Sequence, residues 1–320
     1  MSSPRIIIVG GGAAGFFAAI TAAEAGAAVT VLEKGRDFLS KVRVSGGGRC
    51  NVTHACFEPR EFVTRYPRGE RELLGPFHRF QARDTVEWFA ARGVTLKTES
   101  DGRMFPVSDS SETIIDCLVS AARKTGVQFQ TGCGVIKVER ASSPFTSDDE
   151  QARRPFHLSL ATGETIECDR LLLATGGCRV DEGGGKIAAE LGHTLESPVP
   201  SLFTFRCGAD WLRGLAGVAA ETVEVSVPGT KLRERGPVLV THNGLSGPAI
   251  LRLSAWGARE LHGMDYRFPL RINWLPGRDV AAELEAIRRE QGAKLVTNTP
   301  LSPLPARLWE RLVGAAFLPR

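Results

Sequence analysis

The chain has 320 residues, of which 42% are hydrophobic and 24% charged, and its net charge is +4. This composition excludes a largely disordered chain and suits a soluble globular protein with a sizeable core and two domains. The arginines are scattered rather than gathered into one aromatic-rich run, so we do not expect a nucleic-acid partner.

Cysteine and histidine usage limits the chemistry further. The seven cysteines form no C-x-x-C pair, and the six histidines show no metal-ligand spacing. We therefore expect reduced thiols, a cytoplasmic protein and no metal site.

The N-terminal segment predicts the first half of a dinucleotide-binding unit. The β-branched run 6–9 turns into a Gly-x-Gly-x-x-Gly motif that opens an alanine-rich helix. Glycines at these places let backbone N–H groups approach a pyrophosphate closely. The predicted contacts of this turn are Gly10, Gly12, Ala13, Ala14 and Gly15.

A second strand over Val29–Glu33 completes the βαβ pattern. Glu33 ends it roughly 20 residues after the glycines, where a carboxylate can accept hydrogen bonds from ribose hydroxyls and repel a 2′-phosphate. Lys34 follows it and is included among the cofactor contacts. The alternative, an export signal or membrane helix over 6–32, is disfavoured by the glycine cluster and by Glu24.

The next feature is the glycine-rich stretch Lys41–Thr53, which we interpret as a binding loop without regular structure. Its candidate contacts are Ser45, Gly46, Gly47, Arg49, Cys50 and Asn51. An ordinary tight loop with Arg49 in a surface ion pair is the alternative. Cys50 has no C-x-x-C partner, so we interpret it as a small unreactive residue.

Helical apolar spacing follows over Phe77–Gly93 and Glu112–Gly126. In the first of these helices, four side chains are expected to pack inward: Phe80, Val86, Trp88 and Phe89.

From Val127 the apolar period changes to two, which predicts a small β-meander. Its expected strands are 127–130, 135–138 and 156–160, with a mobile loop over Ala141–Pro155. Val135 is either a backbone contact to adenine or an ordinary core residue of the meander.

The apolar strand Arg170–Leu173 is expected to return the chain to the dinucleotide sheet. It runs into four small residues that belong to the predicted site, Ala174, Thr175, Gly176 and Gly177. Three glycines over 183–185 are then expected to open a helix over 186–191. The order βαβ, meander and small-residue strand favours FAD over NAD as the resident cofactor.

From about Pro198 the composition changes to short strands separated by glycine and proline. Strands are expected over 222–227 and 238–240, and helical segments over 280–290 and 305–316. The predicted domains are therefore 1–195, an FAD-binding Rossmann-like domain with a β-meander, and 196–320, a mostly β domain with a small helical part.

Three motifs together resemble the BaiN/YhiN-like family of FAD-dependent, NAD(P)H-linked oxidoreductases, also described as aminoacetone-oxidase-family flavoproteins. They are Ser45–Thr53, Ala174–Gly177 and Thr241–Leu251. The resemblance spans nearly the whole chain and implies an α/β flavoprotein of the two-dinucleotide-binding-domain type with an inserted β-rich domain.

The chain departs from this family pattern in two places. No strand with a Gly-Glu pair and no glycine-rich helix follows Pro319, so we interpret the chain as a C-terminally shortened member. Asp181–Lys186 stands where the family carries a Gly-Ser-Thr-Gly-type turn.

The expected function is that of an FAD-dependent oxidoreductase. NAD(P)H would reduce the flavin, and a small organic acceptor or oxygen would reoxidise it; Arg49 beside the flavin N1–C2 edge would stabilise the reduced anion. Because there is no second Gly-x-Gly-x-x-Gly, the reductant is expected to visit transiently or to belong to another protein. His242 is a weak catalytic candidate that would otherwise cap the following helix.

Two other functions stay open. One is a flavin-dependent RNA-modifying enzyme, for which the arginines between Arg60 and Arg83 give some support. The other is a non-catalytic flavin-binding remnant. The sequence does not indicate the oligomeric state.

Overall fold

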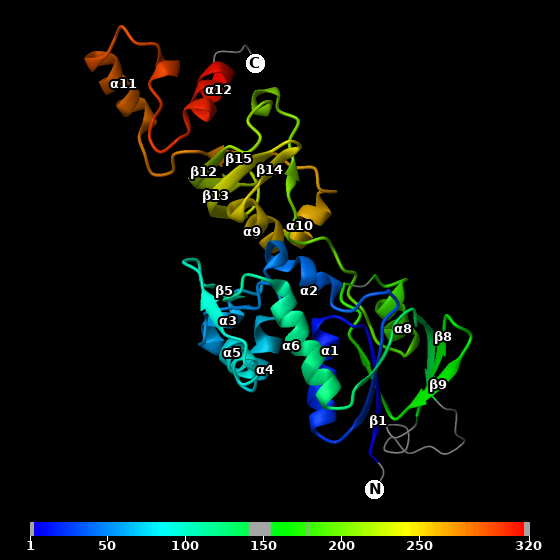
Figure 1. The fold of residues 1–320 in the computed structure, drawn as a ribbon. Coiled ribbons are helices and arrows are strands. Elements are labelled where there is room, and N and C mark those ends of the chain that lie inside the picture. The colour runs from blue at the N-terminus through cyan, green and yellow to red at the C-terminus, as the bar shows by residue number, and fades with distance from the viewer. Residues whose placement is uncertain (1–2, 141–154, 178, 317–320) are drawn as a thin grey trace. The chain divides into compact units, whose positions relative to one another are not determined.

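The computed structural model describes residues 3–140, 155–177 and 179–316, and the expected mobile loop lies outside them except for Pro155. The chain divides into two compact units, Met1–Pro198 and Val199–Arg320 (Figure 1). Each unit has its own hydrophobic core.

The first unit is built on a parallel sheet with strand order β10-β1-β2-β6. Its strands are β1 (Arg5–Val9), β2 (Ala28–Leu32), β6 (Gln128–Gln130) and β10 (Arg170–Leu173). Val9 lies opposite both Leu32 and Leu173. The residues that follow these three strands therefore meet at one edge of the sheet, where ligands of such folds bind.

Alternate side chains of these strands bury opposite faces of the sheet. Ile8, Val29 and Val31 belong to a core shared with α1 (Ala13–Glu24) and α6 (Ser111–Lys124), which contact each other (Figure 1). The other face packs against an antiparallel meander and α8 (Gly183–Glu190). The meander strands are β7 (Val135–Arg140), β8 (Phe156–Leu160) and β9 (Thr165–Cys168).

Two expectations for this unit are wrong. The segment over 127–130 is not a meander strand: the chain enters β6 from α6, and β6 pairs in parallel with β2 at the edge of the sheet. The helix expected over 77–93 is shorter than predicted: α5 spans Ala82–Ala90, and α4 (Glu70–Phe77) ends where the predicted helix begins. Gln81 forms a capping box with Asp84 that starts α5, and the Phe80 side chain is 41% exposed instead of buried.

The same unit also contains a three-stranded antiparallel sheet with strand order β3-β5-β4. The remaining elements of the unit are α2 (Ser40–Val44), η1 (Ser45–Gly48), β3 (Thr53–His54), α3 (Pro59–Val63), β4 (Leu96–Thr98) and β5 (Arg103–Pro106).

The second unit contains an antiparallel sheet with order β11-β14-β13-β12-β15. Its elements are β11 (Phe205–Arg206), η2 (Asp210–Leu212), β12 (Ala219–Ser226), β13 (Arg233–Thr241), β14 (Gly244–Ser246), α9 (Pro248–Trp256), α10 (Ala258–Gly263), β15 (Arg271–Asn273), α11 (Val280–Glu290), η3 (Val296–Asn298) and α12 (Ala306–Ala316). Val223, Val238 and Ile250 join its sheet and α9 in one core. No helix within the described residues has the length and apolar character needed to cross a membrane.

Candidate cofactor-binding site

The three motif glycines do different work at the edge of the parallel sheet. A Cβ on Gly10, whose φ is +116°, would lie 2.3 Å from the Ala174 carbonyl oxygen, and one on Gly15 would lie 1.9 Å from the Gly10 oxygen. These two glycines are therefore required by backbone packing. A Cβ on Gly12 would meet no atom within 4 Å, so Gly12 keeps a space open instead.

That space belongs to a cavity of about 660 Å³ in the first unit. Its walls combine the start of α1, α2 and the segment after it, α5, α6 and the residues after β10. Eight predicted contacts line it: Gly12, Ala13, Ala14, Ser45, Cys50, Asn51, Ala174 and Gly176. Ten others lie outside the lining: Gly10, Gly15, Glu33, Lys34, Gly46, Gly47, Arg49, Val135, Thr175 and Gly177.

The start of α1 gives the cavity its hydrogen-bond donors. Gly12 is the N-cap, its side-chain position is empty, and α1 has no acidic residue in its first turn. The first N–H groups of a helix have no acceptor within the helix, and they carry its positive dipole end. Ala13 and Ala14 are exposed here, so their N–H groups face a space that suits an anion such as a diphosphate.

Glu33 lies directly after β2, and its carboxylate links two backbone segments at the edge of the sheet. One carboxylate oxygen accepts a hydrogen bond from the Gly11 N–H at 2.8 Å, and the other accepts from the Gly35 N–H at 2.7 Å. Each oxygen has a second lone pair, which stays available for a ribose hydroxyl. Val135 begins β7 opposite Leu160 and is half-buried.

The glycine-rich stretch after Lys41 is more regular than expected. It starts within the short helix α2, in which Val42 is buried in the core, so the expectation of a loop is wrong over 41–44. Gly46 and Gly47 then take left-handed φ values of 55° and 70°. A Cβ on Gly46 would lie 2.7 Å from the Asn51 nitrogen, so this turn needs its glycine.

Arg49 is engaged within the protein. Its guanidinium donates to Glu99 at 2.6 Å, lies 3.5 Å from Asp109 and covers the Phe105 ring at 4.0 Å. The hydrogen bond and charge of Glu99 raise the pKa of Arg49 above its usual value. This is the ion-paired arrangement that the sequence left open.

The cavity does have a cation, and sequence reasoning did not select it. Among the lining residues of the described chain, Lys41 has the one charged side chain. Its Nζ lies 3.4 Å from the position that a Cβ on Gly176 would take. The available signal was its place at the start of the glycine-rich motif.

Cys50 lies in the cavity wall but is a poor nucleophile. Its backbone has a φ of +61°, and its side chain is buried. Burial raises the pKa of the Cys50 thiol, against a smaller lowering by a hydrogen bond with Ser45. The thiol form therefore dominates near neutral pH. Nowhere in the described chain do three or more possible metal ligands gather.

In the segment after β10, Gly184 and Gly185 pack against neighbouring residues that leave no room for a side chain. A Cβ on Gly184 would lie 2.2 Å from the Thr175 hydroxyl, and one on Gly185 would lie 2.0 Å from the Arg179 carbonyl oxygen. The start of α8 thus fits directly against the residues that follow β10.

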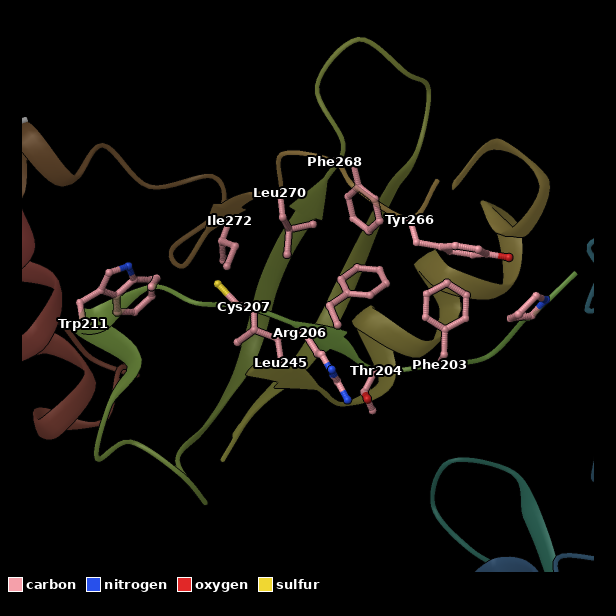
Figure 2. A pocket seen from close by; sticks show the side chains of 13 residues that line it. Phe203, Thr204, Arg206, Cys207, Trp211, Leu245, Tyr266, Phe268, Leu270 and Ile272 are labelled. Carbon is pink, nitrogen blue, oxygen red and sulfur yellow. The ribbon is translucent and has the colours of Figure 1, made fainter. Parts of the chain in front are cut away.

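The second unit has a cavity of its own, of about 590 Å³ (Figure 2). Phe205 and Phe268 meet edge to face at 5.1 Å, and Phe203 and Tyr266 do so at 5.7 Å. Leu270 and Ile272 add apolar surface, so this cavity is built from side chains.

His242 lies in the exposed turn between β13 and β14 and does not line the second-unit cavity. The N-cap of α9 is Gly247, and it makes no side-chain capping hydrogen bond. The interpretation of His242 as a helix cap is therefore wrong.

The parallel sheet and its glycine-built cavity define a Rossmann-type dinucleotide-binding protein. A family model described as the HI0933-like protein Rossmann domain matches residues 4–250, and one described as the HI0933-like protein barrel and H2TH domain matches residues 199–319. The chain belongs to the HI0933-like family, a family of FAD-dependent oxidoreductases, and the resemblance expected from the sequence is confirmed.

Two curated relatives have names that state an activity. The chain is 32% identical to the ribosomal RNA dihydrouridine synthase of Escherichia coli (strain K12), over 98% of this chain and 74% of that protein. It is 28% identical to the 3-dehydro-bile acid delta(4,6)-reductase of Clostridium scindens, over 98% of this chain and 72% of that protein.

Among solved structures, a flavocytochrome c3 fumarate reductase in its open conformation is similar with a TM-score of 0.48 and 20% identity. The match covers 69% of this chain and 47% of that one.

Proposed function

We propose that this chain binds FAD in the first-unit cavity and is a flavin-dependent reductase. The observation that carries the proposal is the open cavity at the edge of the sheet, which Gly12, the start of α1 and Lys41 all line. An anionic, elongated cofactor suits this donor set better than a neutral ligand would.

The residues of the chain would divide the cofactor between them. The N–H groups of Ala13 and Ala14 would bind the diphosphate, and Glu33 would accept from a ribose hydroxyl. Phe17, Ile114 and Leu118 give the cavity an apolar wall that excludes water. When bound, FAD supplies the hydride-transfer chemistry, and the protein supplies position and electrostatics.

The acceptor we propose is a carbon–carbon double bond conjugated with a carbonyl group. The names of the two relatives describe a dihydrouridine-forming enzyme and a delta(4,6)-reductase. Dihydrouridine is uridine saturated at its C5–C6 bond, so both names are consistent with addition of hydrogen to such a bond. NAD(P)H is the reductant we propose, visiting the flavin transiently.

A second candidate is that this double bond belongs to a uracil of ribosomal RNA. Arginines on α3, α4 and the following turn favour it. The side chains of Arg60, Arg71 and Arg79 are exposed, and none has a carboxylate partner among the described residues. Arg79 directly precedes Phe80, which lines the cavity, so one cation able to hold a phosphate is next in sequence to a residue of the cavity wall.

The purified protein tests the proposal. A yellow protein with oxidised-flavin absorbance, bleached by NADH or NADPH under anaerobic conditions, is the expected result. Re-oxidation by a conjugated enone or by unmodified ribosomal RNA then separates the acceptors, and salt-sensitive RNA binding favours the second. A folded, colourless protein that cannot be reconstituted with FAD contradicts the proposal and supports the non-catalytic alternative.

A further inference from the structure

Lys41 is not among the cofactor contacts predicted from the sequence motifs, yet it lines the first-unit cavity. We propose that Lys41 is the counter-ion of the cofactor diphosphate and that it makes cofactor binding electrostatic. This inference rests on the proposed binding of FAD. It concerns one side chain at the start of α2 and can be tested separately from activity.

The first argument is charge. The lining residues of the cavity within the described chain include no carboxylate, and Lys41 is their one charged side chain. A diphosphate that leaves water for this cavity therefore meets no opposing anion and one ammonium group. Charge-assisted hydrogen bonds from such a group are about twice as strong as neutral ones.

The second argument is availability. Lys41 is one of three cations in the segment 41–49. Arg43 bonds to Glu112, and Arg49 bonds to Glu99. Lys41 has no carboxylate partner in the part of the chain that the structure describes. Its ammonium can therefore bind a ligand without breaking an ion pair of the protein.

The third argument is position. The Lys41 Nζ lies beside Gly176, which follows β10 and has a φ of +76°. Gly12 and the first N–H groups of α1 border the same cavity from another element. A point charge and a helix N-terminus thus face one space, which is the arrangement that favours a phosphate group.

The experiment compares ligands that share the adenosine half. Apoprotein is titrated with FAD, ADP and adenosine at several salt concentrations, using the wild type, Lys41→Met, Lys41→Arg and the control Lys231→Met. Lys231 is an exposed lysine of the second unit, so its variant makes the same change in net charge. Sulfite addition to the bound flavin is measured in parallel, because a cation beside the flavin ring would alter it.

We expect Lys41→Met to weaken FAD and ADP about tenfold and to flatten their salt dependence. Adenosine binding and sulfite addition should stay unchanged, Lys41→Arg should retain most of the affinity, and Lys231→Met should resemble the wild type. Unchanged FAD and ADP affinity in Lys41→Met overturns the proposal. An equal loss for adenosine, or a changed sulfite affinity, assigns Lys41 to another part of the ligand and also overturns it.

Failure of the proposed function gives a different pattern. A wild type that binds ADP but not FAD contradicts FAD binding, while the ADP arm still tests Lys41. A wild type that binds neither ligand overturns both proposals.

Discussion

The two cavities have similar volumes, about 660 and 590 Å³, but only the first has a side that is built from backbone and small residues. The first-unit cavity has an apolar wall of side chains that includes Phe17, Ile114 and Leu118, but at the edge of the sheet it is bordered by glycine, alanine and backbone N–H groups, with Lys41 as its one charged side chain among the described residues. The second-unit cavity is bordered by the rings of Phe203, Phe205 and Phe268. Where two backbone segments pack against each other, adding a carbon atom destabilises the fold. Where side chains form the packing, removing atoms destabilises it.

Gly15→Ala should have the largest effect. The added methyl would lie 1.9 Å from the Gly10 carbonyl oxygen, and neither backbone can move without separating α1 from β1. We expect a loss of more than about 4 kcal/mol of unfolding free energy, so the first unit does not fold. Circular dichroism and denaturant unfolding would measure it.

Gly12→Val is the matched control for that substitution. Its side chain enters open space, so the fold should persist while FAD binding is lost. A Gly12→Val protein that keeps its flavin would break the distinction between glycines that pack and the glycine that leaves room.

Phe205→Ala tests the side-chain-built cavity. Phe205 is 8% exposed and contacts Phe268, so truncation should cost about 3 kcal/mol in the second unit. FAD affinity should not change, because this residue belongs to the other unit. Chemical denaturation followed by tryptophan fluorescence would report the loss. Equal weakening of FAD binding would contradict the proposal that residues of the first unit alone hold FAD.

Glu33→Gln should have a moderate effect on the first-unit edge. The carboxylate accepts from Gly11 and Gly35, and an amide in its place offers one acceptor and directs an N–H at the other donor. We expect a loss of about 2 kcal/mol in unfolding free energy together with weaker adenosine binding. Adenosine binding at wild-type strength would mean that Glu33 acts on the protein edge alone.

The smallest effects should be pH effects at the surface of each unit. A hydrogen bond from Lys97 lowers the pKa of Asp109, and one from Arg278 lowers the pKa of Glu283. Each carboxylate has a lower pKa folded than unfolded, so its stabilisation is present above the unfolded value and is lost as pH falls through the folded one.

Asp109→Asn and Glu283→Gln should therefore reduce the acid sensitivity of unfolding below about pH 4. Both groups are at the surface, so the changes should be small. Unfolding midpoints between about pH 6 and pH 3 would test this. Identical pH curves for wild type and variants would show that neither pair contributes.

The βαβ turn could be predicted because its signal is local. Gly10, Gly15 and Glu33 are read from spacing, and the structure explains each by a contact within the first 35 residues or at the end of β10. The strands around Val225 and Val238 and the helices α11 and α12 were likewise visible as short periodic patterns.

The rest depends on partners distant in sequence. β6 pairs with β2 and not with β7. An apolar period of two indicates a strand but does not indicate which strand it pairs with. Arg49 has its partners Glu99 and Asp109 about 50 and 60 residues later. Lys41 reaches the cavity because α2 turns it toward the end of β10, which a loop interpretation does not anticipate.

The pairing of β1 with β10 has a consequence for biosynthesis. β1 (Arg5–Val9) pairs with β10 (Arg170–Leu173), so more than half of the chain must be synthesised before β1 has a neighbouring strand on both sides. Such distant pairing slows folding. Ala174 and Gly176, which line the cavity, follow β10 directly, so the cavity lining is complete only after that strand has been synthesised. On a ribosome, acquisition of flavin fluorescence or quenching would therefore report when β10 and the residues that follow it have joined the sheet.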